Sequence, residues 1–140
     1  LTLEMTGELV VFDYDDGRLQ PVQTVAMDPG RRDGNAAAAL HLSGDGRFLY
    51  ASNRGEDNHI AVYAVDAANG TLTAMQRRST EGRGPRDFAL SPDGRHVVVA
   101  NQHSNTLVVI ERDPRSGRLG DTVQAMTAVS PSDVKFVPVE

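Results

Sequence analysis

Three polar side chains stand at comparable places in the sequence, each directly after a run of β-type residues. Glu4 follows the first run, Arg54 follows Asn53 of the second, and Gln102 follows Asn101 of the third. A carboxylate can activate a water molecule, and a guanidinium or an amide can hold an oxyanion. If the three runs meet at one rim, these residues predict a polar pocket for an oxyanionic substrate.

Two further residues are candidates for the same pocket. Arg86 lies in Gly82–Phe88, just ahead of an expected inner strand, and His41 lies within the preceding inner strand. His41 either faces the pocket as an acid or base, or packs and hydrogen-bonds within the fold. Asn53 and Asn101 either bind substrate or bond to the backbone at the strand ends.

No metal or cofactor site is expected from the sequence. The histidines lack the His-x-His or His-x-x-x-His spacing of zinc sites, since they stand at His41, His59, His96 and His103. There is no Gly-x-Ser-x-Gly elbow, phosphate-binding loop or dinucleotide fingerprint.

The elements that must position these side chains form an internal repeat. The stretch that begins at Leu42 (LSGDG) returns 48 residues later at Leu90 (LSPDG), and Asn53 returns as Asn101. Each copy holds several short apolar runs separated by Gly- and Asp-rich turns. A period in the upper forties with this pattern is typical of a β-propeller blade.

The repeat predicts an all-β fold of four-stranded antiparallel blades. Residues 1–27 form the outer strands of one blade, 36–79 and 86–127 form full blades, and 131–138 forms a closing inner strand. Asp28–Asn35 is a polar connection between blades. Three blades cannot close a ring, so we expect this chain to be part of a longer one.

Composition excludes several classes of protein. The chain has 140 residues, a net charge of −5 and no cysteine. The charge argues against a nucleic-acid partner or an anionic membrane surface, and no apolar run reaches the roughly 18 residues of a membrane span. Without a disulfide framework or signal-like leader, we expect a cytoplasmic protein.

The chain resembles a known family over nearly its whole length. The resemblance is carried by 40–55 (LHLSGDGRFLYASNRG), 84–88 (GPRDF), 99–102 (VANQ) and 131–137. These motifs are similar to those of the lactonase family of seven-bladed β-propellers, typified by bacterial 6-phosphogluconolactonase. The chain would then supply about three of an expected seven blades.

The resemblance implies hydrolysis of a sugar lactone, most directly 6-phosphogluconolactone in the pentose phosphate pathway, without a metal or cofactor. Glu4 matches the family's acidic residue, with Leu3 in place of Asn, and would activate the water. Arg54 and Arg86 match its arginines and would hold the substrate's phosphate or carboxylate and the oxyanion. His41 would be a second acid or base.

Substrate-binding roles are expected for Asn53, Asn101 and Gln102. One position departs from the family's usual pattern, because Ala39 stands where an acid precedes Leu-His. This permits an alternative, a non-catalytic propeller that binds a ligand or protein at its rim. A carboxymuconate-type lactonising cyclase, using the same arginines on a dicarboxylate, is another alternative.

The expected partners are a phosphorylated or carboxylated lactone and other blades. The open edges predict that the chain needs the missing N-terminal blades or associates with itself. We expect the 140-residue chain alone to be inactive.

Overall fold

The computed structural model describes residues 1–30, 34 and 36–137, which form an all-β fold. The fold class predicted from the repeat is confirmed. One short 3-10 turn, η1 (Gln102–Ser104), accompanies the strands. The strands are β1 (Thr2–Leu3), β2 (Glu8–Asp15), β3 (Arg18–Ala26), β4 (Ala36–Leu42), β5 (Phe48–Arg54), β6 (His59–Val65), β7 (Leu72–Ser79), β8 (Pro85–Leu90), β9 (His96–Asn101), β10 (Thr106–Arg112) and β11 (Leu119–Thr127).

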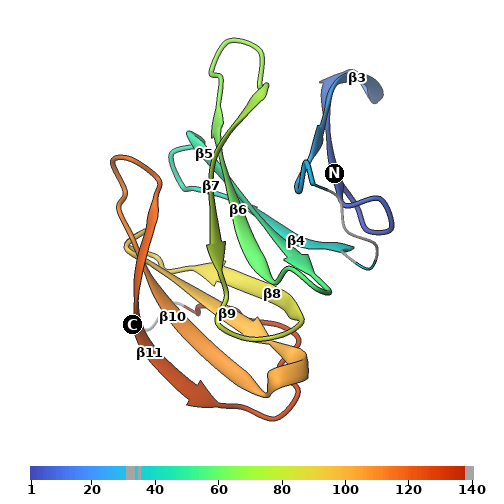
Figure 1. Cartoon of the computed structure of the whole chain (residues 1–140). Helices are drawn as coiled ribbons and strands as arrows, with labels where there is room; N and C mark the ends of the chain where they lie inside the picture. Colours follow the sequence, from blue (N-terminus) through green and yellow to red (C-terminus); the bar gives the residue numbers. More distant parts are fainter. Residues whose placement is uncertain (31–33, 35, 138–140) are drawn as a thin grey trace.

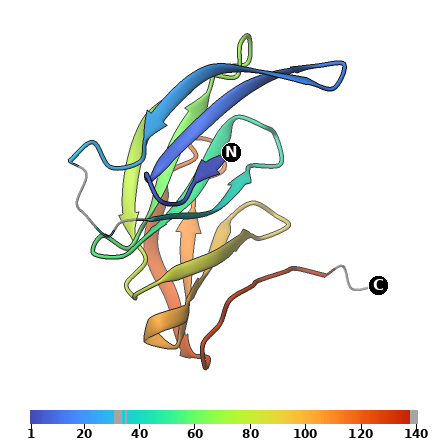
Figure 2. The ribbon, with the colours of Figure 1, turned by 90° about the vertical axis from the view of Figure 1, so that its right-hand side faces the viewer.

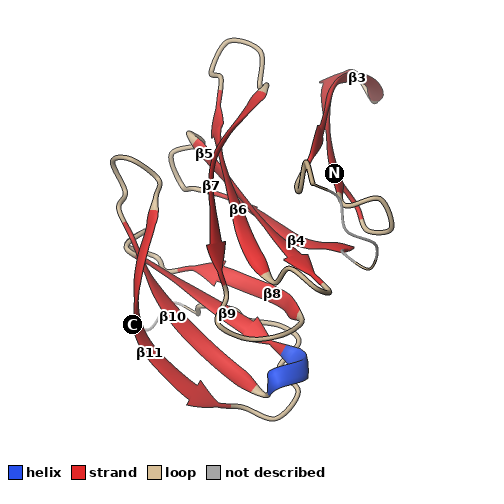
Figure 3. Ribbon diagram, in the orientation of Figure 1, coloured by secondary structure: helices blue, strands red, loops and turns tan. Residues whose placement is uncertain are grey.

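The strands form three antiparallel sheets that follow one another along the chain. The first sheet has the order β1-β2-β3, the middle sheet β4-β5-β6-β7, and the last sheet β8-β9-β10-β11. Figures 1 and 3 show the three sheets side by side, with the middle sheet between the other two. Each strand pairs with its sequence neighbour, so every sheet is an up-and-down unit of the kind that builds a propeller.

The middle sheet has a hydrophobic core on both of its faces because successive side chains of a strand point in opposite directions. From β5, Phe48 and Tyr50 pack toward the last sheet, together with Phe88, Val99 and Ile110. The next residues in alternation, Leu49 and Ala51, pack toward the first sheet together with Leu9, Met27 and Tyr63. The near-continuous apolar sequence of β5 therefore reflects burial on two sides.

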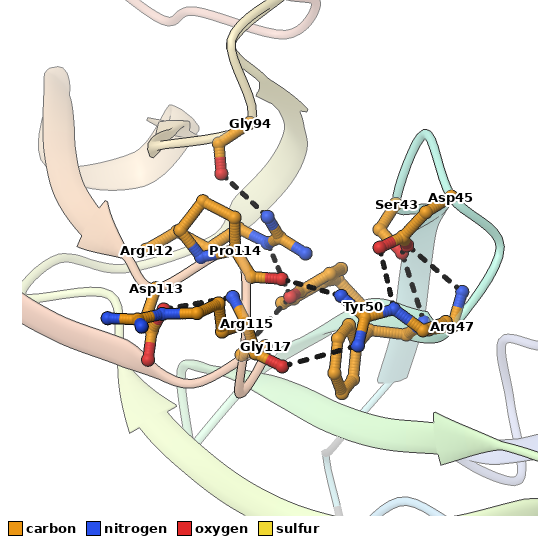
Figure 4. Close-up of polar contacts among 11 residues, drawn as sticks. Ser43, Asp45, Arg47, Tyr50, Gly94, Arg112, Asp113, Pro114, Arg115 and Gly117 are labelled. Carbon is orange, nitrogen blue, oxygen red and sulfur yellow. Dashed lines mark hydrogen bonds and ion pairs between the residues drawn. The ribbon is translucent and has the colours of Figure 1, made fainter.

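A buried hydrogen-bond network joins the middle and last sheets (Figure 4). The Tyr50 hydroxyl donates to the Gly117 carbonyl oxygen at 2.6 Å and accepts from Arg112 Nε at 2.6 Å. Arg112 Nη1 also donates to the Gly94 carbonyl oxygen at 2.6 Å. Gly117 has a φ of +73°, and an added Cβ would lie 2.4 Å from Cδ1 of Phe48. Only glycine permits this close approach.

After β11, the chain turns away from the last sheet and passes its inner strand β8 without pairing with it (Figure 2). Its described residues, 128–137, are assigned to no strand, and the backbone N–H of Val134 donates to Asp87 Oδ2 at 3.0 Å. A strand requires a hydrogen-bonded partner strand, which none of the described residues supplies. The closing strand expected over 131–138 therefore stays a prediction, and residue 138 lies outside the described residues.

Two other expectations concern the link after β3 and membrane-spanning segments. The polar link expected over Asp28–Asn35 joins the first and middle sheets, but residues 31–33 and 35 lie outside the described part of the chain. Among the described residues, no helix is long and apolar enough to cross a membrane.

Candidate functional site

A polar cavity of about 370 Å³ lies where the three sheets and the C-terminal segment meet. It brings together Glu4, Arg54 and Arg86, which the sequence analysis selected from separate stretches of the chain. The other lining residues are Thr2, Ala37, Ala38, Ala39, Asp87, Ser132, Asp133 and Lys135.

Irregular strand pairing brings consecutive residues of the inner strands to this cavity. The register between β8 and β9 shifts between Pro85 and Asp87, and the register between β4 and β5 shifts between Ala37 and Leu40. A β-bulge interrupts the alternation of side chains. Arg86 and Asp87 can therefore both line the cavity, although they are neighbours in sequence.

Backbone contacts hold Glu4 beside the inner strand of the middle sheet. The N–H of Ala37 donates to the Glu4 carbonyl oxygen at 3.2 Å, and Thr2 Oγ1 donates to the Ala38 carbonyl oxygen at 3.3 Å. The end of β1 is thus fixed against the start of β4, and the Glu4 side chain reaches the end of β5.

Glu4 and Arg54 form an ion pair across the first and middle sheets, between Oε1 and Nη2. The Arg54 side chain is only 16 % exposed, whereas Glu4 is 58 % exposed. Arg54 Nε is buried and has no hydrogen-bond partner among the described residues. A buried donor without a partner is costly, so the ion pair with Glu4, and not this N–H, is the contact that holds the Arg54 guanidinium at the cavity.

Arg86 is the cation of this cavity without a carboxylate partner within the described residues. Arg54 pairs with Glu4, and Lys135 Nζ lies 3.3 Å from Asp87 Oδ2 and also pairs with Asp133. Arg86 is exposed and forms no hydrogen bond or ion pair in the described chain. Its planar guanidinium can therefore bind an external phosphate or carboxylate in bidentate fashion.

Asp87 links the last sheet, the middle sheet and the C-terminal segment. Its side chain is 13 % exposed; Oδ2 accepts from Val134 and Lys135, and Oδ1 lies 3.4 Å from His41 Nε2. Burial alone would raise the pKa of Asp87, but hydrogen bonds with the Val134 backbone, Asp133 and His41 outweigh it and lower the pKa. Asp87 is therefore a carboxylate at neutral pH.

His41 contacts Asp87 but does not itself line the cavity. Its ring meets Phe88 edge-on, with centroids 4.8 Å apart and an interplanar angle of 77°. Sequence reasoning did not select Asp87 as a site residue. The repeat could have indicated Asp87, because it stands 48 residues after Ala39. It is therefore an acid at the equivalent position of the next sheet.

The three residues expected to bind substrate lie outside the lining of this cavity. Asn53 and Asn101 are fully buried, and Asn101 Nδ2 donates to the Thr80 carbonyl oxygen at 2.9 Å. Gln102 opens η1, and its N–H donates to the Gly84 carbonyl oxygen at 2.9 Å. Their substrate-binding roles stay predictions, and the contact of Asn101 fits the backbone-bonding alternative.

Outside this cavity, the described residues form a larger hollow and no metal-binding cluster. A larger hollow of about 840 Å³ is lined by residues of β9–β11 and the turn between β10 and β11, and it contains none of the predicted site residues. In the described chain, no group of three or more His, Asp or Glu residues could hold a metal ion. The small cavity is thus where the selected residues meet.

Comparisons with known proteins agree on one family. The sequence model described as "Lactonase, 7-bladed beta-propeller" matches residues 1–136. The 6-phosphogluconolactonase of Bacillus subtilis is 36% identical over 137 residues, covering 96% of this chain and 39% of that protein. A 6-phosphogluconolactonase of Formosa agariphila is 32% identical over 134 residues, covering 95% and 38%.

A solved structure shows the same arrangement of strands. The periplasmic gluconolactonase of Pseudomonas aeruginosa matches with a TM-score of 0.95 and 50% identity, over 99% of this chain and 39% of that one. The chain thus spans about two fifths of the length of the relatives that it matches.

Proposed function

The chain belongs to the lactonase family of seven-bladed β-propellers, and on this basis we propose that the protein hydrolyses the ester bond of a sugar δ-lactone. The observation that carries the proposal is the cavity in which Glu4, Arg54 and Arg86 meet. Its mixture of one exposed carboxylate and two guanidinium groups suits water attack on an anionic ester.

In the proposed reaction, the Glu4 carboxylate takes a proton from a water molecule whose oxygen attacks the lactone carbonyl carbon. The carbonyl oxygen then carries the negative charge of the tetrahedral intermediate. The guanidinium of Arg54, which lines the cavity beside Glu4, supports a role in stabilising this charge, because a donor held in place needs little reorganisation.

Collapse of the intermediate breaks the bond between the carbonyl carbon and the ring oxygen. The leaving oxygen needs a proton to become the hydroxyl of the open-chain acid. We assign this second acid role to His41, which lies behind the cavity lining with its Nε2 3.4 Å from the carboxylate of the lining residue Asp87. Asp87 would orient the imidazole, as a carboxylate does beside a catalytic histidine.

The predicted substrate is 6-phosphogluconolactone. Arg86, which has no ion-pair partner among the described residues, would bind the phosphate. The names of the B. subtilis and F. agariphila relatives support this substrate, while the P. aeruginosa relative is named for the unphosphorylated lactone. These names favour a lactonase over the binding module and the carboxymuconate-type cyclase.

The compartment is also part of the proposal. We place the protein in the cytoplasm because the chain has no cysteine and its predicted substrate is phosphorylated. The P. aeruginosa relative is named periplasmic. Fractionation of the source cells, with an antibody against this chain, would distinguish the two compartments.

The test is lactone hydrolysis at neutral pH by the propeller that contains this chain, corrected for spontaneous ring opening. We expect faster turnover of 6-phosphogluconolactone than of gluconolactone. A rate that collapses in Glu4→Gln would support Glu4 as the base. No enzyme-dependent rate on either lactone would contradict the proposal and favour the binding module.

A further inference from the structure

A glutamine side chain clamps the outermost strand of the following sheet. Gln76, on β7 of the middle sheet, donates from Nε2 to the Leu119 carbonyl oxygen at 2.8 Å. Its Oε1 accepts from the Leu119 N–H at 2.8 Å. Leu119 is the first residue of β11, so one side-chain amide satisfies both backbone groups of the residue that opens the next edge strand.

The same clamp joins the first and middle sheets. Gln23, on β3, donates from Nε2 to the Leu72 carbonyl oxygen at 3.0 Å and accepts from the Leu72 N–H at 2.7 Å. Leu72 opens β7 as Leu119 opens β11. Two independent interfaces therefore use one side-chain type and one backbone position, which makes the clamp a repeated feature of how these sheets pack.

Strand register identifies a third member of the series. Gln23 pairs with Val11 and Gln76 with Val62, and in both cases the register shifts immediately afterwards. Gln124 of β11 pairs with Val109, and the register again shifts at the next step. The bulge presents each glutamine in the same way. Gln124 thus occupies the clamp position of the last sheet.

Unlike its two equivalents, the Gln124 side chain is exposed and has no hydrogen bond to any described residue. At the other end of the chain, the complementary half of such an interface is exposed: a leucine near the start of an outermost strand, with no glutamine hydrogen-bonded to it among the described residues. This residue is Leu19, the second residue of β3, which pairs with Tyr14 of β2 as Leu72 of β7 pairs with Val65 of β6. Leu72 is 8% exposed, whereas Leu19 is 62% exposed.

We propose that Gln124 docks a further blade of the same propeller by clamping the first residue of that blade's outermost strand. The occupant is a blade from the rest of the propeller, because this chain covers 39% of its matched relatives and the family is seven-bladed. The partner residue presents an unpaired N–H and C=O at a strand edge and an apolar side chain that becomes buried, as Leu72 does.

The experiment compares glutamine variants in the propeller that contains this chain. Gln124→Ala should lower Tm by about 3–6 °C, as should Gln76→Ala, because each loses two hydrogen bonds at an interface. The matched control is Gln20→Ala, since Gln20 is exposed on β3 and its side chain has no hydrogen bond within the described residues. A Tm unchanged in Gln124→Ala, with the loss in Gln76→Ala intact, would overturn the proposal.

The mass of the same propeller, measured by light scattering, provides the second arm. We expect the same mass for the unmodified protein, Gln76→Ala and Gln124→Ala at every protein concentration. A mass that falls only in Gln124→Ala would assign the clamp to a second copy and overturn the assignment to a further blade.

Discussion

Asp87 and His41 lie on neighbouring sheets and 46 residues apart in sequence, yet Oδ1 of the carboxylate is 3.4 Å from Nε2 of the imidazole. The inner strand that carries His41 has Ala39, where the family resemblance led us to expect an acid. Asp87 brings a carboxylate to the same cavity from the next sheet. The cavity therefore keeps a carboxylate beside the histidine.

Asp87→Asn should change the pH dependence of stability. The lowered pKa of Asp87 means that the folded state binds its proton less readily than the unfolded state, whose Asp pKa is about 3.9. Its stabilising contribution is therefore complete above about pH 4 and is lost as pH falls through the lower folded-state pKa. In urea unfolding from pH 7 to pH 2, the free energy of unfolding should therefore fall less on acidification in the variant than in the unmodified protein.

The matched control for that measurement is Asp121→Asn. Asp121 is exposed on β11 and has no ion pair in the described chain. Its acid profile should follow that of the unmodified protein. Parallel profiles for Asp87→Asn and the unmodified protein would mean that Asp87 has an ordinary pKa.

Arg54→Ala and Glu4→Gln should each lower kcat/KM by about 10²-fold or more if the proposed reaction is correct. Because the two side chains form an ion pair, the losses should not add in the double variant. The measurement is steady-state lactone hydrolysis by the three variants. Arg18→Ala, at the exposed first residue of β3, serves as the control and should keep full activity.

Arg86→Gln should separate binding of the phosphate from chemistry. Loss of a charge-assisted bidentate contact should raise KM for 6-phosphogluconolactone about tenfold or more. The kcat/KM for unphosphorylated gluconolactone should change little. Equal losses on both lactones would remove phosphate binding from the role of Arg86.

Tyr50→Phe should destabilise the joint between the middle and last sheets. The change removes the acceptor of the Arg112 Nε–H and the donor to the Gly117 carbonyl oxygen. Burying unsatisfied partners costs about 1–3 kcal/mol in the free energy of unfolding. Tyr14→Phe is the control, since Tyr14 is 70% exposed, and chemical denaturation would measure both.

Gly117→Ala should cost more than Gly70→Ala, although both residues occupy equivalent turns. Their φ values are +73° and +71°, so both pay about 1–2 kcal/mol for a left-handed alanine. Only at Gly117 would the new Cβ meet a neighbour, since it lies 2.4 Å from Phe48 while nothing lies within 4 Å at Gly70. Overpacking should add about 1–3 kcal/mol. Equal unfolding free energies would show that Phe48 moves aside freely.

The sheets were predictable because their signals are local and repeated. Turn residues such as Gly46 and Gly94 recur at the same offset as the apolar strands between them. Antiparallel neighbours in sequence need only short turns to pair. The segment 131–137 lacks this advantage, because its strand pairing depends on residues that do not adjoin it.

The candidate site was only partly predictable. Glu4, Arg54 and Arg86 line one cavity, while the roles expected for them stay predictions. Gln102 occupies the position equivalent to Arg54 but lies outside the cavity lining. Each sheet is displaced from the one before, so equivalence in the repeat does not bring side chains together.

By itself, the sequence determined the strands, their turns and the repeat, because period-two burial and turn chemistry act over a few residues. It also marked the charged residues at the strand ends. The tertiary structure alone decided which partners these residues have: Asp87 for His41, Glu4 for Arg54, and Leu119 for Gln76. These contacts cross from one sheet to the next, and their geometry depends on bulges and on the packing of whole sheets, which no local pattern encodes.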